Sequence, residues 1–225
     1  MSVAGRLGDI RARVEGACRR AGRPASDVTL VAVSKGQPAS AVREAYAAAQ
    51  RDFGESYAQE LRDKARDLAD LPGIRWHFIG PLQANKAKYV VGTAVMFHAL
   101  DRVELAQALD QRLARDGGTL EVLLEVNVGG EASKHGVRPE DTVALAAALA
   151  PLARLKLRGL MCIPPPREDP QQVRPDFRTL RALAGSLGLP VLSMGMSDDF
   201  EVAIEEGATH VRVGTAIFGA RPAKE

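Results

Sequence analysis

The chain has 225 residues, 46% of them hydrophobic, and this length suits a single α/β barrel domain over residues 1–225. Thirty basic and 28 acidic residues give a formal net charge of +2, and because the signs are interleaved without a basic block, we expect no nucleic acid partner. No stretch approaches the roughly 20 apolar residues of a membrane helix and no secretion signal is evident, so the sequence predicts a cytoplasmic protein with no membrane partner.

The two cysteines, Cys18 and Cys162, lie far apart and show none of the spacings that metal ligands use. This pattern predicts reduced thiols, as in the cytoplasm, and no metal site. Cys162 stands in an apolar segment, so we expect it to pack in the core.

Short apolar strands alternate with amphipathic helical stretches along the chain. A first helix at 3–21 ends before Gly22-Arg23-Pro24 and could plug the barrel or pack beneath it. The predicted strands are 28–34, 52–54, 74–79, 94–99, 120–128, 155–162, 191–193 and 210–213, and the predicted helices between them are 40–50, 57–71, 83–91, 103–115, 139–152, 175–187 and 198–206. Eight such strands predict a (β/α)8 TIM barrel with an additional N-terminal helix. A doubly wound open sheet is the alternative, although it normally has fewer strands at this length.

The most informative position is Lys35, which follows the uninterrupted apolar run at 28–34. Such a run predicts a strand buried on both faces, which would deliver Lys35 to the carboxyl-terminal rim where α/β proteins bind ligands. A desolvated amine loses its charge readily and can attack a carbonyl to form a Schiff base. The alternative is a strand-end lysine that only extends to water.

Glycine-bearing loops follow the seventh and eighth predicted strands, where TIM barrels usually bind phosphate. Their backbone N–H groups and hydroxyls are suitable phosphate donors. The candidate residues are Gly195, Ser197, Gly214 and Thr215. Alternatively, the glycines only form turns and Ser197 only caps the helix that follows.

Arg212 alternates with Val211 and Val213, which places its side chain in the barrel lumen near the mouth. A guanidinium there needs hydrogen-bond acceptors, and either Glu125 on the fifth strand or a ligand ring nitrogen could provide one. An amine, a phosphate cradle and this arginine together describe a site for pyridoxal 5′-phosphate (PLP).

Seven short segments together carry a more specific signal than any single motif, because they follow one another over nearly the whole chain. They are Ala32-Val33-Ser34-Lys35, Phe53-Gly54-Glu55, Trp76-His77-Phe78-Ile79-Gly80-Pro81-Leu82-Gln83, Asn85-Lys86, Arg158-Gly159-Leu160-Met161, Gly195-Met196-Ser197-Asp198-Asp199 and Val211-Arg212-Val213-Gly214-Thr215-Ala216-Ile217-Phe218-Gly219. With these segments the chain resembles the pyridoxal phosphate homeostasis proteins.

The resemblance implies an alanine-racemase-like barrel that holds PLP as an aldimine on Lys35. It assigns the phosphate to Ser197, Gly214 and Thr215, and the pyridine nitrogen to Arg212. Two positions depart from the family pattern: Gln37 stands where the family often has lysine, and Ser56 stands where asparagine is common. A serine hydroxyl cannot make the paired contacts of an amide, which leaves a site role for position 56 open.

An arginine opposite the pyridine nitrogen weakens the ring as an electron sink. The resembling racemases compensate with a tyrosine from an additional carboxyl-terminal domain, and we expect no such domain in this chain. We expect Tyr46, Tyr57 and Tyr89 to pack in or beside helices. His77 is the remaining acid–base candidate, although a histidine within a strand is more commonly a hydrogen-bonded core residue.

We therefore predict a monomeric, non-enzymatic carrier that buffers PLP or delivers it to PLP-dependent apoenzymes, with the loop at 129–136 as a gate. One alternative is an amino-acid racemase of low activity that uses Lys35 as a base. The other is a regulator that binds proteins and senses vitamin B6 status through the cofactor.

Overall fold

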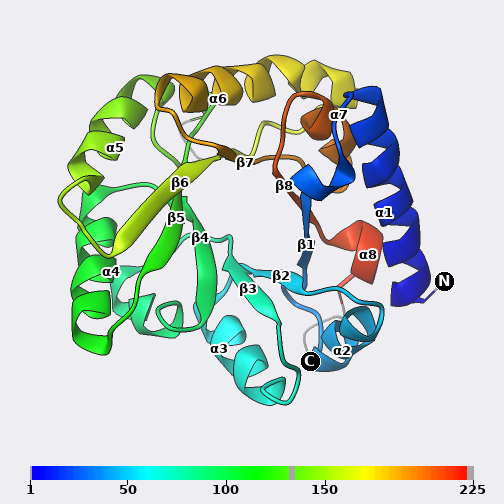
Figure 1. Ribbon diagram of the computed structural model, residues 1–225, viewed down its shortest axis with the longest axis horizontal. Helices are drawn as coiled ribbons and strands as arrows, with labels where there is room; N and C mark the ends of the chain where they lie inside the picture. The colour runs from blue at the N-terminus through cyan, green and yellow to red at the C-terminus, as the bar shows by residue number, and fades with distance from the viewer. Residues whose placement is uncertain (1, 132–134, 222–225) are drawn as a thin grey trace.

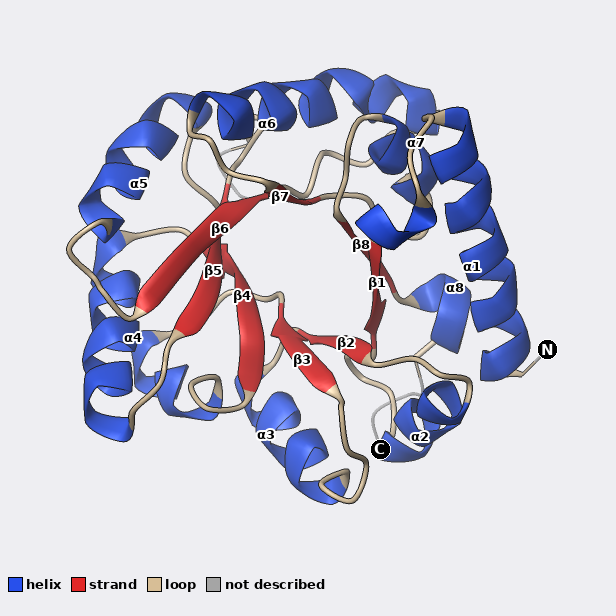
Figure 2. Cartoon of the chain, viewed as in Figure 1, coloured by secondary structure: helices blue, strands red, loops and turns tan. Residues whose placement is uncertain are grey.

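Eight parallel strands close into a barrel in the computed structural model, which describes residues 2–131 and 135–221 (Figure 2). The strands are β1 (Thr29–Val33), β2 (Asp52–Glu55), β3 (Arg75–Phe78), β4 (Ala94–Leu100), β5 (Leu120–Glu125), β6 (Leu155–Met161), β7 (Val191–Ser193) and β8 (His210–Val213). The first and last strands pair with each other, with Val31 beside Arg212, and this pairing completes the barrel. The predicted barrel is thus confirmed, and the open sheet is excluded.

Helices surround the barrel on its outer side (Figure 1). They are α1 (Val3–Arg20), α2 (Ala39–Ala47), α3 (Ala58–Asp67), α4 (Val103–Asp116), α5 (Thr142–Leu149), α6 (Arg174–Ser186), α7 (Phe200–Glu205) and α8 (Thr215–Phe218). The segment predicted as a helix at 83–91 is instead a 3-10 helix, Ala84–Tyr89, with the three-residue hydrogen bond from Val90 to Ala87. The fifth strand ends at Glu125, earlier than predicted, because Val126 then pairs with Val137 across a loop.

The N-terminal helix α1 lies on the side of the barrel, so the expectation that it plugs the barrel or packs beneath it is wrong (Figure 1). One apolar stripe, which includes Leu7, Ile10 and Val14, is buried, and the helix contacts α2, α7 and α8. Because α8 has only four residues, α1 covers the outer face beside β8 and β1. Arg13 and Arg20 hold it to α7 through ion pairs with Glu201.

The parallel arrangement brings the carboxyl ends of all strands to one end of the barrel. Lys35 follows β1, Ser197 follows β7 and Thr215 follows β8, so residues far apart in sequence meet at this mouth. Cys18 and Cys162 are both buried free thiols, and Cys162 packs in the core as predicted. Among residues 2–131 and 135–221, none of the helices has the length and apolar character needed to cross a bilayer.

Candidate functional site

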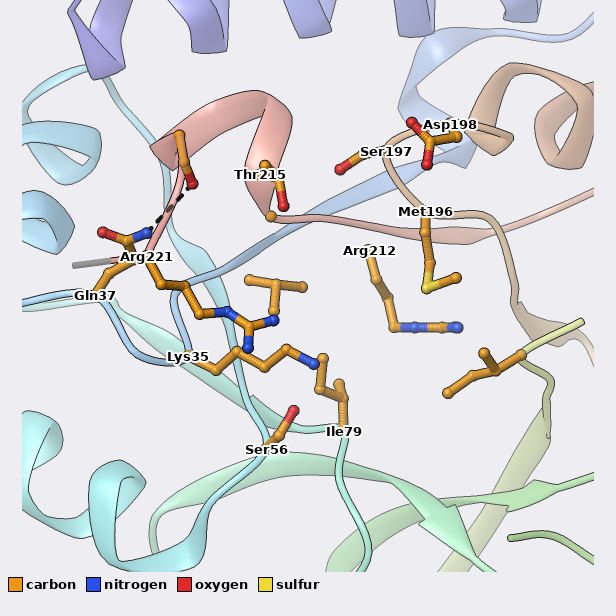
Figure 3. A pocket seen from close by; sticks show the side chains of 14 residues that line it. Lys35, Gln37, Ser56, Ile79, Met196, Ser197, Asp198, Arg212, Thr215 and Arg221 are labelled. Carbon is orange, nitrogen blue, oxygen red and sulfur yellow. Dashed lines mark hydrogen bonds between the residues drawn. The ribbon is translucent and has the colours of Figure 1, made fainter. Parts of the chain in front are cut away.

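A cavity of about 250 Å³ lies at the mouth of the barrel. It collects five of the six predicted site residues, namely Lys35, Ser197, Arg212, Gly214 and Thr215 (Figure 3). Because these residues follow or belong to β1, β7 and β8, only closure of the barrel brings them together.

Gly195 is the sixth predicted residue, and it does not line the cavity. Its φ of +92° is one that glycine tolerates best, and a Cβ there would lie 2.9 Å from the Cα of Phe200. The small residue therefore lets the loop after β7 turn tightly against α7. This turn presents Met196 and Ser197 to the cavity.

Lys35 stands in the turn after β1, half-buried, with its side chain directed into the cavity (Figure 3). Burial lowers the pKa of its amine, and the nearby cations Arg221 and Arg212 lower it further, against the opposite effects of Glu55 and Glu60. No hydrogen bond or ion pair joins the amine to another residue of the described part of the chain. The amine is therefore available as a nucleophile.

Lys64 on α3 holds the turn that carries Lys35, a role that the sequence indicates only weakly. Its ammonium is buried and donates to the Ser34 carbonyl at 2.6 Å, to Glu55 Oε1 at 2.7 Å and to Glu60 Oε1 at 2.7 Å. The same Glu60 oxygen accepts from the Gly36 N–H at 2.7 Å. The backbone on both sides of Lys35 is thus fixed by one ion-pair cluster. The weak indication in the sequence is the four-residue spacing of Glu60 and Lys64, which lets two opposite charges meet on one face of a helix.

The hydroxyls of Ser197, in the loop after β7, and of Thr215, the first residue of α8, face the cavity (Figure 3). Neither hydroxyl has a hydrogen-bond partner within residues 2–131 and 135–221. The alternative that Ser197 caps the next helix is wrong, because α7 begins at Phe200 and Asp199 is its N-cap residue. Both hydroxyls therefore remain able to donate to a ligand.

The charged groups of the cavity are mainly cationic. Lys35, Arg212 and Arg221 line it, against the single carboxylate of Asp198. Arg221 was not predicted from the sequence, in which it is one arginine near the carboxyl terminus. Its side chain packs on Gly36, so the end of the described chain reaches the turn of Lys35. A cavity with this charge favours an anionic ligand.

Arg212 is buried in the lumen, as predicted, with its guanidinium reaching the cavity. Its Nη1 donates to Ser193 Oγ at 2.7 Å and its Nη2 donates to the Cys162 carbonyl at 2.9 Å. The suggestion of Glu125 as its direct partner is wrong, because none of the ion pairs among the described residues joins the two. Burial raises the pKa of Glu125 to about 6, with Asp101 adding to the effect.

In the described part of the chain, neither His77 nor any of the three tyrosines lines this cavity. His77 is buried within the barrel and hydrogen-bonds to Asp52 and His98, as a core histidine would. Tyr46 donates to the Pro72 carbonyl, Tyr89 stacks with Arg62, and Tyr57 lines a neighbouring surface cavity.

Two further expectations concern loops and departures from the family pattern. Of the proposed gate at 129–136, residues 132–134 lie outside the described part of the chain.

Gln37 is buried, and its amide donates to the Gly219 carbonyl at 3.5 Å, which ties the Lys35 turn to the segment after α8 (Figure 3). Ser56 lines the cavity, and Gly80 lies so close to it that a Cβ at Gly80 would overlap the Ser56 backbone.

Comparison with known domains agrees with this arrangement. The family model described as alanine racemase, N-terminal domain, matches residues 6–222. An alanine racemase of Clostridium difficile 630 has the same fold, with a TM-score of 0.74 at 12% identity over 99% of this chain and 58% of the racemase. The fold and the site thus define a barrel of the alanine racemase N-terminal class.

Relatives with higher sequence identity identify one family within this class. The pyridoxal phosphate homeostasis protein of Pseudomonas aeruginosa is 50% identical over 98% of this chain and 96% of its own, and that of Escherichia coli K12 is 44% identical over 97% of each. The structure of PipY from Synechococcus elongatus with PLP bound has a TM-score of 0.85 at 38% identity, covering 97% of this chain and 100% of PipY. This chain belongs to the pyridoxal phosphate homeostasis protein family.

Proposed function

We propose that this protein binds PLP covalently through Lys35 and contributes to PLP homeostasis by buffering the cofactor or delivering it to apoenzymes. The Lys35 amine would attack the PLP aldehyde, and one water would leave as the imine bond forms. The names of the relatives and the PLP in the PipY structure support this assignment. Reversal of the same step by water would release the cofactor.

The observation that carries the proposal is the position of the Lys35 amine. It has no hydrogen bond to the described protein, its pKa is lowered by burial, and it shares one cavity with three kinds of group that suit PLP. The hydroxyls of Ser197 and Thr215 and the backbone at Gly214 suit the phosphate. The guanidinium of Arg212 suits the pyridine nitrogen. Gly195 contributes by shaping the loop that presents Ser197.

A carrier is favoured over an enzyme by the lining of the cavity. When bound, PLP supplies an electron sink, which is strongest when its ring nitrogen is protonated. Arg212 can only donate to that nitrogen, which disfavours protonation. Within the described chain, no tyrosine or histidine lines the cavity to act as a second base beside Lys35. We therefore propose a non-catalytic role, with low racemase activity as the alternative.

Borohydride reduction of the PLP-loaded protein, followed by peptide mass spectrometry, tests the covalent bond. We expect one pyridoxyl adduct, on Lys35, and none in the Lys35→Ala variant. Lys156→Ala is the matched control, because Lys156 is exposed and lies outside the cavity. An adduct that persists in Lys35→Ala would refute the proposal.

Two further assays separate the carrier from its alternatives. Exchange of the α-proton of amino acids in deuterated water would indicate a racemase, and we expect none across a broad panel. A regulator would change its protein binding when PLP is added. We expect instead that the loaded protein restores activity to a PLP-dependent apoenzyme at a rate set by release from Lys35.

A further inference from the structure

A second cavity, of about 480 Å³, lies at the mouth of the barrel, and the proposed function gives it no role. It is lined from the loops that follow β2, β3, β4 and β5, whereas the Lys35 cavity is lined mainly from the loops that follow β1, β7 and β8. Ser56 lines both, so the two cavities adjoin. The carboxyl-terminal face of a barrel is the usual place for ligands, and this volume suits a small molecule.

Lys86 lines the second cavity as a cation without a counter-ion. Its side chain is half-buried, and none of the hydrogen bonds or ion pairs within residues 2–131 and 135–221 involves its ammonium. The Tyr89 ring, whose centroid is 5.9 Å from Lys86 Nζ, adds a cation–π contact but no negative charge. Lys86 also belongs to the Asn85-Lys86 segment of the family pattern, which does not line the Lys35 cavity.

Arg102 is the second cation of this lining, and its position is fixed. Its Nη1 donates to Asp101 Oδ1 at 2.6 Å, and its Nη2 donates to the Leu82 carbonyl at 2.8 Å. Because Leu82 lies in the loop after β3, these bonds tie two walls of the cavity together. A guanidinium has five N–H groups, so Arg102 keeps further donors for a ligand.

Negative charge is missing from the second cavity, since no carboxylate of the described chain lines it. Glu60, the acidic residue in the first turn of α3, points instead to the Lys35 turn, where it accepts from Lys64 and Gly36. Four neutral side chains of the lining can donate and have no hydrogen-bond partner among residues 2–131 and 135–221; they are Ser56, Tyr57, Gln59 and Gln83.

The walls of this cavity are held by the main chain. The Ile79 N–H donates to the Glu55 carbonyl at 2.8 Å, and a Cβ at Gly80 would lie only 2.3 Å from the Ser56 carbonyl oxygen. The loops after β2 and β3 therefore pack directly on each other. A ligand would meet a cavity that already has its shape.

We propose that the second cavity binds a small organic anion, a carboxylate or a phosphate ester, through Lys86 and Arg102. Both classes present anionic oxygen atoms, which a lysine meets as a point charge and an arginine meets with several N–H groups. The absence of a carboxylate from the described lining leaves the charge of Lys86 for the ligand. The site is separate from the Lys35 cavity, so that the anion and the cofactor can be bound together.

Carbon-13 NMR of protein with labelled methyl groups on its lysines measures the environment of Lys86 directly. Reductive methylation keeps the charge of the ammonium groups, the chain has seven lysines, and Lys86→Arg identifies the signal of Lys86. Inorganic phosphate and acetate are the probes. We expect a saturable shift of the Lys86 signal with at least one probe, and none for the exposed Lys88 and Lys156.

The probe that responds identifies the class of anion. An unchanged Lys86 signal with both probes, or equal shifts of all exposed lysines, would overturn the proposal. Arg102→Gln should weaken binding of the responding probe roughly tenfold, because a charged donor is lost. Arg115→Gln, which removes an exposed arginine outside the cavity, is the control.

An affinity unchanged in Arg102→Gln would place the anion outside the second cavity and reject the site. Circular dichroism identifies a variant that has lost its fold. The wild-type titration remains decisive in that case, because it requires no substitution.

Loading with PLP and reduction by borohydride before methylation distinguish two sites from one, and this arm rests on the proposed function. We expect the shift of the Lys86 signal to persist in the loaded protein. Its loss would show that the cofactor itself fills the second cavity and would reject a separate site. Failure of the proposed function would look different, because no adduct would form on Lys35 while titration of the unloaded protein would still test Lys86.

Discussion

At the scale of single residues, the site depends on buried charged side chains that are paired with side chains of opposite charge. Glu55 and Lys64 form a buried ion pair at 2.7 Å beneath the Lys35 turn. The second oxygen of Glu55, Oε2, is buried without a hydrogen-bond partner in the described structure. An ion pair of this kind contributes little net stability when complete, but removal of one partner is strongly destabilising.

Lys64→Met should therefore destabilise the fold and loosen the turn that carries Lys35. Loss of one partner from a buried ion pair costs about 3–5 kcal/mol in the free energy of unfolding. Urea denaturation measures this loss, with Lys88→Met as the exposed control, for which we expect a change within about 0.5 kcal/mol. Equal stability of the two variants would contradict a structural role for Lys64.

Glu55 should make stability depend on pH in a defined window. Burial raises its pKa from 4.5 to about 6, despite the opposing effects of Lys64 and Ser34. A folded-state pKa above the unfolded value means that the folded protein binds the proton more tightly. The stabilisation is thus complete below the unfolded pKa and is lost as the pH rises through this window.

We expect the free energy of unfolding of the wild type, relative to Glu55→Gln, to fall by roughly 2 kcal/mol across that window. Urea denaturation at a series of pH values measures both profiles. Subtraction removes the contribution of Glu125, whose pKa burial also raises to about 6. A constant difference between the two profiles would show that Glu55 does not titrate there.

At the scale of elements, α1 acts as part of the barrel wall. It covers the side of β8 and β1 that the four-residue α8 leaves open, so its apolar stripe contributes to the core. The helix was predicted correctly from its periodicity, but its place was not, because an amphipathic stripe indicates only that one face is buried.

Leu7→Ala should test this role. Leu7 is fully buried on α1, and replacement of a buried leucine by alanine costs about 2–5 kcal/mol. Arg13→Ala on the same helix is the control, since it removes a surface ion pair with Glu201 worth at most about 1 kcal/mol. If α1 were dispensable to the barrel, the two variants would unfold at similar urea concentrations.

At the scale of the whole molecule, the oligomeric state stays a prediction from the sequence, and we expect a monomer. Multi-angle light scattering should give the mass of one chain, with and without PLP. A mass of two chains would contradict the prediction and would direct attention to residues contributed by a partner.

Much of the site was predictable because its signals are local. The apolar run before Lys35, the glycine loops near Ser197 and Thr215, and the alternation around Arg212 each lie within a few residues. Arg221 and the Lys64 cluster were missed because their roles depend on contacts with the Lys35 turn, which no local pattern records.

The sequence by itself determined the eight strands, their burial and the order in which the site residues occur, since periodic patterns report which faces leave water. Only the tertiary structure decided what surrounds each charge. Arg212 has Ser193 and Cys162 as partners and not Glu125, and α1 lies beside the barrel. The partners of Arg212 and the position of α1 both depend on closure of the sheet, which brings strands distant in sequence within hydrogen-bond distance of one another.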